Sequence, residues 1–196
     1  ITMSDMPVHG LAAGATGAGK SVFINQLLAT LITKYPPSTL ELILIDFKNA
    51  EFPVLKHADT CISRIPHAKI LAGTKDGEYI VSVFEYLLSD MEKRNEKFTK
   101  YDTKKLSDYN KKVRALGHPE EIIPRTLLLI DEFQVMFTQM DGKTLERIQV
   151  LLTNLAKLGR NAGVHMLLTS QSMAGTMSQD VKDQFSFRVA LRCSAD

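Results

Sequence analysis

The residues with the clearest chemistry form a glycine-rich loop near the N-terminus that ends in a lysine and a serine. Its eight positions, which match the pattern GxxxxGK[ST], are Gly14, Ala15, Thr16, Gly17, Ala18, Gly19, Lys20 and Ser21. Glycines let successive backbone N–H groups turn toward phosphate oxygens, and a helix beginning after the loop presents its positive end to them. The lysine then contacts the β and γ phosphates of a nucleotide, while the serine hydroxyl ligates Mg²⁺. The loop therefore predicts a binding site for ATP and Mg²⁺.

A second pattern places two acids after an apolar run. Residues 127–130 read Leu-Leu-Leu-Ile and are followed by Asp131 and Glu132. We expect Asp131 to hold Mg²⁺ through its water shell, and Glu132 to take the proton of the attacking water as a general base. A competing acid, Asp46, also ends an apolar run but has no Glu beside it. We expect Asp46 to line the same sheet edge without contacting the metal.

A polar residue, Gln171, follows a third apolar run, Val164 to Thr169. Parallel strands deliver their C-terminal residues to one crevice, so this amide is expected to contact the γ phosphate or the attacking water, although it could instead cap a surface turn. Together the three strand ends indicate the branch of P-loop proteins in which one further strand separates the P-loop strand from the Asp-Glu strand. That excludes small kinases and Ras-like switches.

The elements that must position these residues alternate between strand-length apolar runs and longer helical patterns, which is typical of a mainly parallel α/β sheet with helices on both faces. The predicted strands are His9–Ala13, Leu40–Ile45, Leu127–Ile130, Val164–Thr169 and Phe187–Leu191, with weaker candidates at Thr60–Ser63 and Lys69–Ala72. The predicted helices are Ser21–Thr33, Glu78–Phe98 and Leu145–Leu158. No repeat or low-complexity linker interrupts the pattern, so we expect one domain.

Composition agrees with this architecture. The chain has 196 residues, 44% of them hydrophobic, and no apolar run approaches the ~18 residues of a membrane span. The N-terminus lacks the pattern of a signal peptide. Cys61 and Cys193 have neither disulfide-framework nor metal spacing, so we expect two reduced thiols and a cytoplasmic domain.

Charge is unevenly distributed along the chain. The net charge is +2, yet residues 92–114 hold nine basic residues against four acidic ones and carry a local net charge of +5. Such a segment is either a solvated helix face or a surface for nucleic acid.

Several segments carry a family resemblance. In order and spacing they resemble the motor domain of the FtsK/SpoIIIE DNA translocases. The segments are HGLAAGATGAGKSVFINQLL, LELILIDFKNAEF, DYNKKV, RTLLLIDEFQVMF, LAKLGRNAGVHMLLTSQS and FRVALRCSAD. The resemblance implies a RecA-like P-loop ATPase that assembles as a homo-oligomeric ring, usually a hexamer, and pulls double-stranded DNA through its pore. It also implies that residues 1–196 are the motor domain of a longer bacterial protein, cut short at the C-terminal end, whose other parts associate with a membrane.

The same resemblance assigns one basic residue. Arg160, in LGRNAG, matches a position that related ring ATPases point into the neighbouring subunit's nucleotide site; alternatively it is a cation at a helix C-terminus. After Gln171 the chain departs from the family, because Ser172 to Gly175 replace the usual Arg-Pro. The loop that follows therefore need not contact DNA as it does in the translocases.

The sequence thus predicts an ATP-driven motor that translocates duplex DNA. Two alternatives stay open: an ATPase domain of the type VII secretion kind, which acts on polypeptide, and a slow nucleotide-binding module that serves assembly. The intact Glu132 argues against the slow module.

Overall fold

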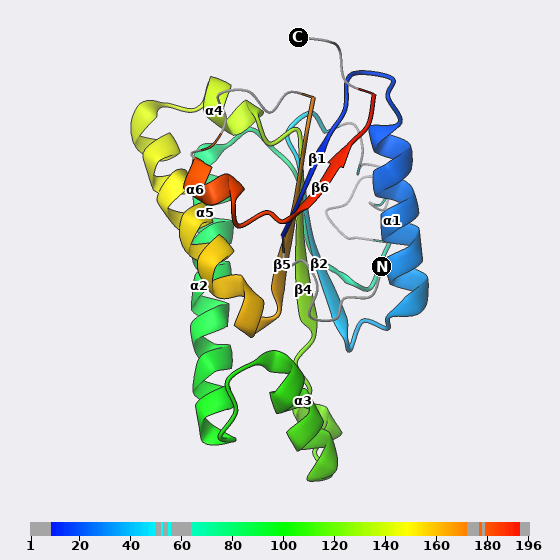
Figure 1. Ribbon diagram of the computed structural model, residues 1–196, viewed down its shortest axis with the longest axis vertical. Coiled ribbons are helices and arrows are strands. Elements are labelled where there is room, and N and C mark those ends of the chain that lie inside the picture. The colour runs from blue at the N-terminus through cyan, green and yellow to red at the C-terminus, as the bar shows by residue number, and fades with distance from the viewer. Residues whose placement is uncertain are drawn as a thin grey trace.

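A six-stranded parallel sheet forms the centre of the molecule (Figure 1). The computed structural model describes residues 9–49, 52, 55, 64–171, 177 and 179–192. The strands are β1 (His9–Ala13), β2 (Leu40–Asp46), β3 (Ala68–Gly73), β4 (Arg125–Asp131), β5 (Val164–Ser170) and β6 (Phe187–Ala190). Their order is β3-β2-β4-β5-β1-β6, so β5 lies between the strand that precedes the glycine-rich loop and the strand that ends in Asp131. The predicted fold class and the intervening strand are confirmed.

Helices cover both faces of this sheet. They are α1 (Lys20–Lys34), α2 (Gly77–Lys100), α3 (Leu106–Ala115), α4 (Val135–Gln139), α5 (Gly142–Ala162) and α6 (Gln179–Lys182), with a 3-10 turn, η2, at Pro119–Glu121. In Figure 1, α1 packs on one face, and α2 and α5 lie side by side on the other. Within the described part of the chain, no helix is long and apolar enough to cross a bilayer.

Side-chain alternation along the strands divides the core into two clusters. Ile43 and Ile45 of β2 face α2 and α5, whereas Leu42 and Leu44 face α1. All four side chains are fully buried. Because both faces are covered, the strands read as continuous apolar runs rather than alternating ones, which is why the sequence located them well.

Caps fix where the two long helices begin and end. Asp76 accepts hydrogen bonds from the backbone N–H groups of Glu78 and Tyr79 at the start of α2, and Asp141 caps α5 in the same way. Gly163 ends α5 in a left-handed conformation with φ 75°. The chain then enters β5 directly at Val164, so α5 ends at the edge of the sheet where the parallel strands begin.

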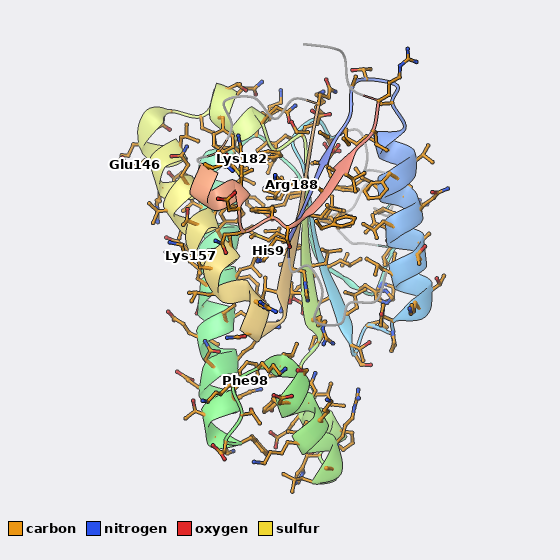
Figure 2. All side chains as sticks on the ribbon, viewed as in Figure 1. His9, Phe98, Glu146, Lys157, Lys182 and Arg188 are labelled. Carbon is orange, nitrogen blue, oxygen red and sulfur yellow. The ribbon has the colours of Figure 1, made fainter. Side chains whose placement is uncertain are left out.

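The basic segment contains one buried and several exposed cations. Arg94 of α2 is only 4% exposed and donates to the carbonyls of Pro124 and Ala162, both at 3.0 Å, and to Thr126 Oγ1. Phe98 lies between α2 and α3 (Figure 2), in a small cluster with Tyr109. Phe98 therefore packs α3 against α2, whereas Arg94 ties α2 to the start of β4 and the end of α5, and the lysines of this segment face solvent.

Two predictions fall outside the described residues. These are the weak extended segment Thr60–Ser63 and the state of both cysteines. The other weak candidate, Lys69–Ala72, is confirmed as part of β3.

Candidate functional site

The glycine-rich loop connects β1 to α1 and is anchored to the strands on both sides. The N–H of Gly14 donates to the carbonyl of Ser170 in β5, and the N–H of Ala15 donates to Arg192 after β6, each at 3.1 Å. Gly17 and Gly19 have φ values of 78° and 91°, and a Cβ at either position would meet no atom within 4 Å. The glycines therefore supply left-handed backbone beside open space, as a phosphate-binding loop requires.

Lys20, the first residue of α1, joins this loop to the two predicted acids. Its buried ammonium donates to Asp131 Oδ1 and, at 2.8 Å, to Glu132 Oε1. Burial alone would lower the pKa of Lys20, but the hydrogen bonds and charges of the two carboxylates raise it above its ordinary value. The structure thus brings the predicted phosphate ligand and both predicted acids into one charged cluster.

Glu132 is the centre of this cluster. Its Oε1 accepts from Lys20 and Gln171, and its Oε2 contacts Lys48 and accepts from Gln134. Burial raises the pKa of Glu132, but the donors, led by Lys20 and Gln134, lower it below its usual value overall. The carboxylate is therefore ionised at neutral pH, as a general base must be.

Sequence reasoning did not predict the contacts of Lys48 and Gln134 with Glu132. Gln134 lies in the turn after Glu132 and also accepts a hydrogen bond from Ser170 Oγ at 2.7 Å, which ties the ends of β4 and β5 together. The sequence offered one sign of the Gln134 contact, namely a polar side chain two residues after Glu132. Lys48 lies in the turn after β2. Its contact with Glu132 could not be predicted without knowing that β2 lies next to β4 in the sheet.

Asp131 and Asp46 end neighbouring strands and are paired in the register of β4 and β2. Asp131 accepts a hydrogen bond from Thr169 Oγ1, and burial raises its pKa against the opposing effect of Lys20. Asp46 uses its Oδ1 to accept the N–H of Lys48 at 2.8 Å. Asp46 thus lies at the predicted sheet edge.

Gln171 and Arg160 are placed very differently. Gln171 directly follows β5, and its Nε2 donates to Glu132 Oε1 at 2.9 Å, so the amide lies in the cluster; its contact with phosphate or water stays a prediction. Arg160 is exposed in the last turn of α5, at the edge where β5 begins. A seven-residue strand spans about 23 Å, so Arg160 cannot reach the cluster of its own chain.

The donor set fits the nucleotide and metal that the sequence predicts. The Lys20 ammonium lies between the carboxylates of Asp131 and Glu132, which shows that these two acids can neutralise a cation. Hard oxygen donors such as the Asp131 carboxylate and the Ser21 hydroxyl are the ligands that Mg²⁺ prefers. The open loop and the N-terminus of α1 complete a site suited to phosphate.

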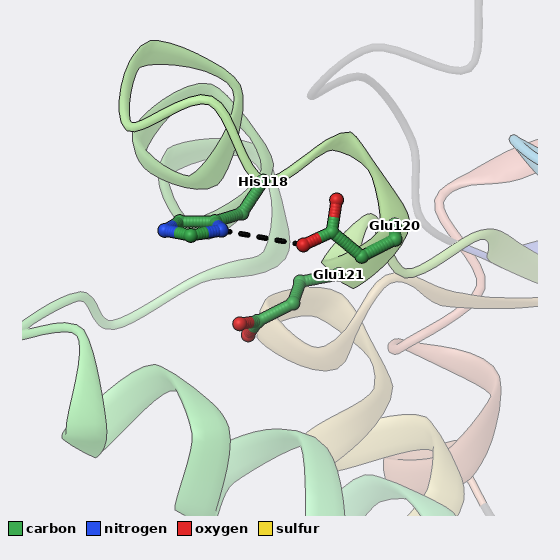
Figure 3. A group of neighbouring side chains, drawn as sticks. All are labelled: His118, Glu120 and Glu121. Carbon is green, nitrogen blue, oxygen red and sulfur yellow. Dashed lines mark hydrogen bonds and ion pairs between the residues drawn. The ribbon is translucent and has the colours of Figure 1, made fainter.

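A separate group of possible metal ligands lies at η2. Among the described residues, His118, Glu120 and Glu121 offer ligand atoms that all lie within 4.8 Å of one another (Figure 3). His118 Nδ1 is 3.2 Å from the Glu120 carboxylate, and Glu121 accepts hydrogen bonds from Tyr101 and Tyr109. These contacts secure η2 against α2 and α3 and give the group a structural role.

Comparison with curated proteins gives relatives that are much longer than this chain. The DNA translocase FtsK of Helicobacter pylori (strain J99) is 30% identical over 190 residues, which are 94% of this chain and 21% of the relative. The ESX secretion system protein YukB of Bacillus subtilis is 28% identical over 94% of this chain and 12% of its own length. The chain therefore spans about a fifth or less of these relatives.

Solved structures share the fold. The cytoplasmic domain of the type VII secretion ATPase EccC from Thermomonospora curvata is 27% identical, with a TM-score of 0.77, over 95% of this chain and 21% of that one. The conjugation coupling protein TcpA of pCW3 has a TM-score of 0.76 at 23% identity, over 97% of this chain and 50% of that one, and supports the fold alone. The FtsK/SpoIIIE family model matches residues 1–175. Because that match covers most of the chain and includes the loop, the acids and Gln171, the chain belongs to the FtsK/SpoIIIE family.

Proposed function

We propose that this chain is the motor domain of an ATP-hydrolysing ring that translocates double-stranded DNA. The observation that carries the proposal is the position of Glu132, whose carboxylate is contacted by Lys20 from the phosphate-binding loop and by Gln171 from the end of β5. A base, a phosphate-binding cation and a polar group that can sense the γ phosphate thus meet at one point.

Each residue of the cluster has a step in hydrolysis. The backbone N–H groups of the loop bind the phosphates, and the Lys20 ammonium exchanges its carboxylate partners for the β and γ phosphates. Glu132 accepts the proton of the attacking water, and Gln171 orients that water or the γ phosphate. Mg²⁺, held by Ser21 and through water by Asp131, would neutralise charge that develops on the phosphate oxygens.

A ring supplies the charge that one chain lacks. Arg160 lies too far from its own cluster and is exposed, so it is free to enter the site of a neighbouring copy. An arginine contributed in trans stabilises the charge of the transition state. We therefore propose a homo-oligomeric ring, a hexamer by analogy with the family, on the cytoplasmic face of a membrane-associated protein.

Double-stranded DNA is the proposed substrate because curated relatives at about 30% identity are named DNA translocases. A translocating pore must hold the phosphate backbone, since base-specific contacts would stop it at particular sequences. The turn Phe47–Asn49 follows β2 at the ligand edge of the sheet and is a candidate pore element. The second candidate, the loop Ser172–Gln179, lies largely outside the described residues.

A polypeptide-secretion ATPase is the second candidate function. Its support is the similarity to the type VII secretion ATPase EccC and to YukB, which reaches 27–28% identity over nearly the whole chain. Such a motor would use the same hydrolytic residues on a different substrate.

The choice between DNA and polypeptide as the substrate is tested by ATPase assays of the full-length protein. Activity is measured with and without duplex DNA at two salt concentrations. A DNA motor is stimulated by duplex DNA, and the stimulation weakens steeply as salt rises, because phosphate contacts release counterions. Glu132→Gln is the control for hydrolysis by contaminants. Absence of duplex binding even at low salt would overturn the DNA proposal and favour the secretion ATPase.

A further inference from the structure

The turn after β2 is fixed at three points around Lys48. The preceding residue, Phe47, is 1% exposed and donates its N–H to the carbonyl of Asp131 at 3.4 Å. Lys48 itself donates its N–H to Asp46 Oδ1 at 2.8 Å. Asn49 has φ 53° and packs so closely on Gly73 of β3 that a Cβ there would lie 1.9 Å from Asn49 Oδ1. The position of the Lys48 backbone is therefore determined by the fold.

From this turn the Lys48 ammonium reaches the proposed base. Its Nζ lies 3.3 Å from Glu132 Oε2, and the Lys48 side chain is 45% exposed while that of Glu132 is 3% exposed. The pair thus joins a carboxylate inside the site to a cation accessible from solvent.

The other contacts of Glu132 show what the pair does. An ionised carboxylate offers about four acceptor positions, two on each oxygen. Lys20 and Gln171 contact Oε1, while Lys48 and Gln134 contact Oε2. Three hydrogen bonds and the ion pair with Lys48 thus hold both oxygens of the carboxylate and restrain its orientation.

Nucleotide binding would remove only part of this restraint. Phosphates attract Lys20, which frees a position on Oε1, but they leave the contact of Lys48 with Oε2 in place. The Lys48 contact ends when another anion competes for the exposed ammonium, and the turn that carries it lies at the edge of the sheet where ligands bind.

We propose that Lys48 is a positioning residue that restrains Glu132 until a phosphate of the DNA substrate draws its ammonium away. The inference rests on the proposed function, since it takes Glu132 as the base and DNA as the polyanion. It makes Lys48 the link between substrate in the pore and hydrolysis at the nucleotide site.

The test compares Lys48→Met, which keeps the length of the side chain and removes its charge, with Lys48→Arg, which keeps the charge. Lys75→Met is the matched control, because Lys75 is an exposed lysine after β3 at the same edge and has no ion pair within the described part of the chain. Basal and stimulated kcat and the KM for ATP are measured in the full-length protein, with duplex DNA and with polyglutamate as probes.

Lys48→Met is expected to raise basal kcat by up to about 5-fold, the worth of a half-exposed ion pair, and to reduce the stimulation by duplex DNA accordingly. The KM for ATP stays unchanged, and Lys48→Arg and Lys75→Met behave like the parent. A basal kcat that is unchanged or lower in Lys48→Met overturns the proposal, as does a raised KM, which would indicate a role in holding the fold.

Failure of the proposed function gives a different result. If polyglutamate stimulates the parent and duplex DNA does not, DNA is excluded as the polyanion. A raised basal rate in Lys48→Met still supports the restraint in that case, because it is measured without either polyanion.

Discussion

Lys20 and Glu132 form a buried ion pair in which Nζ and Oε1 are 2.8 Å apart. The pair links the start of α1 to the end of β4 across the intervening strand β5. The cation proposed to bind phosphate and the carboxylate proposed to activate water thus satisfy each other, so substitution of either residue also changes the surroundings of the other.

Lys20→Ala and Glu132→Gln are expected to separate nucleotide binding from hydrolysis. Lys20→Ala removes the phosphate contact and leaves two buried carboxylates without their cation, so it weakens nucleotide binding and lowers the free energy of unfolding by about 3 kcal/mol. Glu132→Gln keeps an acceptor oxygen for Lys20 but removes the base, so nucleotide binds and hydrolysis falls by about 10²- to 10⁴-fold. Titration with a fluorescent nucleotide and steady-state ATPase assays check both. Hydrolysis at the parental rate in Glu132→Gln would show that the base is another group.

Arg160→Ala is expected to abolish the dependence of ATPase activity on protein concentration. In the proposed ring a neighbouring copy supplies the arginine, so we expect the specific activity of the parent to rise with concentration; such a residue is worth about 10³- to 10⁵-fold in other phosphoryl-transfer enzymes. Nucleotide binding stays unchanged, since Arg160 lies at the opposite edge of the sheet from its own loop. Parental activity in Arg160→Ala would leave the arginine with a helix-terminal role only.

Neutralising Lys104, Lys105, Lys111 and Lys112 together is expected to leave the salt dependence of DNA binding unchanged. All four side chains are exposed on α3 and the turn before it, and α3 lies at the end of the molecule away from the glycine-rich loop (Figure 1). If all four contacted phosphate, the slope of log K against log salt would become shallower by up to about four. Fluorescence anisotropy at several salt concentrations distinguishes the two, and a shallower slope would assign this face to DNA.

The buried His9 is expected to make the fold less stable in mild acid. Its Nδ1 accepts the N–H of Met166 at 3.1 Å, which leaves Nε2 to donate to the carbonyl of Ala156 at 3.0 Å. Burial and, secondarily, the charge of His165 lower the pKa of His9 from 6.5 to about 4. Because the unfolded chain binds this proton more readily, stability falls as pH drops from about 6.5 toward 4, by about 2 kcal/mol at pH 5.

Urea unfolding at pH 7.5 and pH 5 measures the effect of His9. A non-titrating replacement, His9→Gln, should show a smaller loss of unfolding free energy between these two pH values than the parent does. An equal loss in both proteins would mean that other groups carry the acid sensitivity.

The sequence located the sheet and the three long helices because their apolar patterns are strong and their ends are marked. It missed α3, although Leu106, Tyr109 and Val113 lie at helical spacing and are its buried residues. The high charge of the surrounding segment concealed them. The short helices α4 and α6 contain too few turns for a periodic pattern to be recognised.

The site was predictable where its residues belong to one local pattern. Asp131 ends a strand, and the loop, Glu132 and Gln171 each directly follow one, so the parallel strands bring them together. The contact of Lys48 with Glu132 joins residues that are 84 positions apart and depends on β2 lying next to β4, which only the strand order reveals.

The backbone of Glu132 has φ 56°, a left-handed value that a residue with a side chain rarely adopts. Such a conformation costs about 1 kcal/mol relative to glycine, which tolerates it. The contacts of the carboxylate with Lys20, Gln171, Gln134 and Lys48 oppose this backbone cost, and glycine could make none of them. The side chain that serves hydrolysis in the proposed function therefore also holds the strained turn after β4 in place, so this residue joins backbone conformation to chemistry.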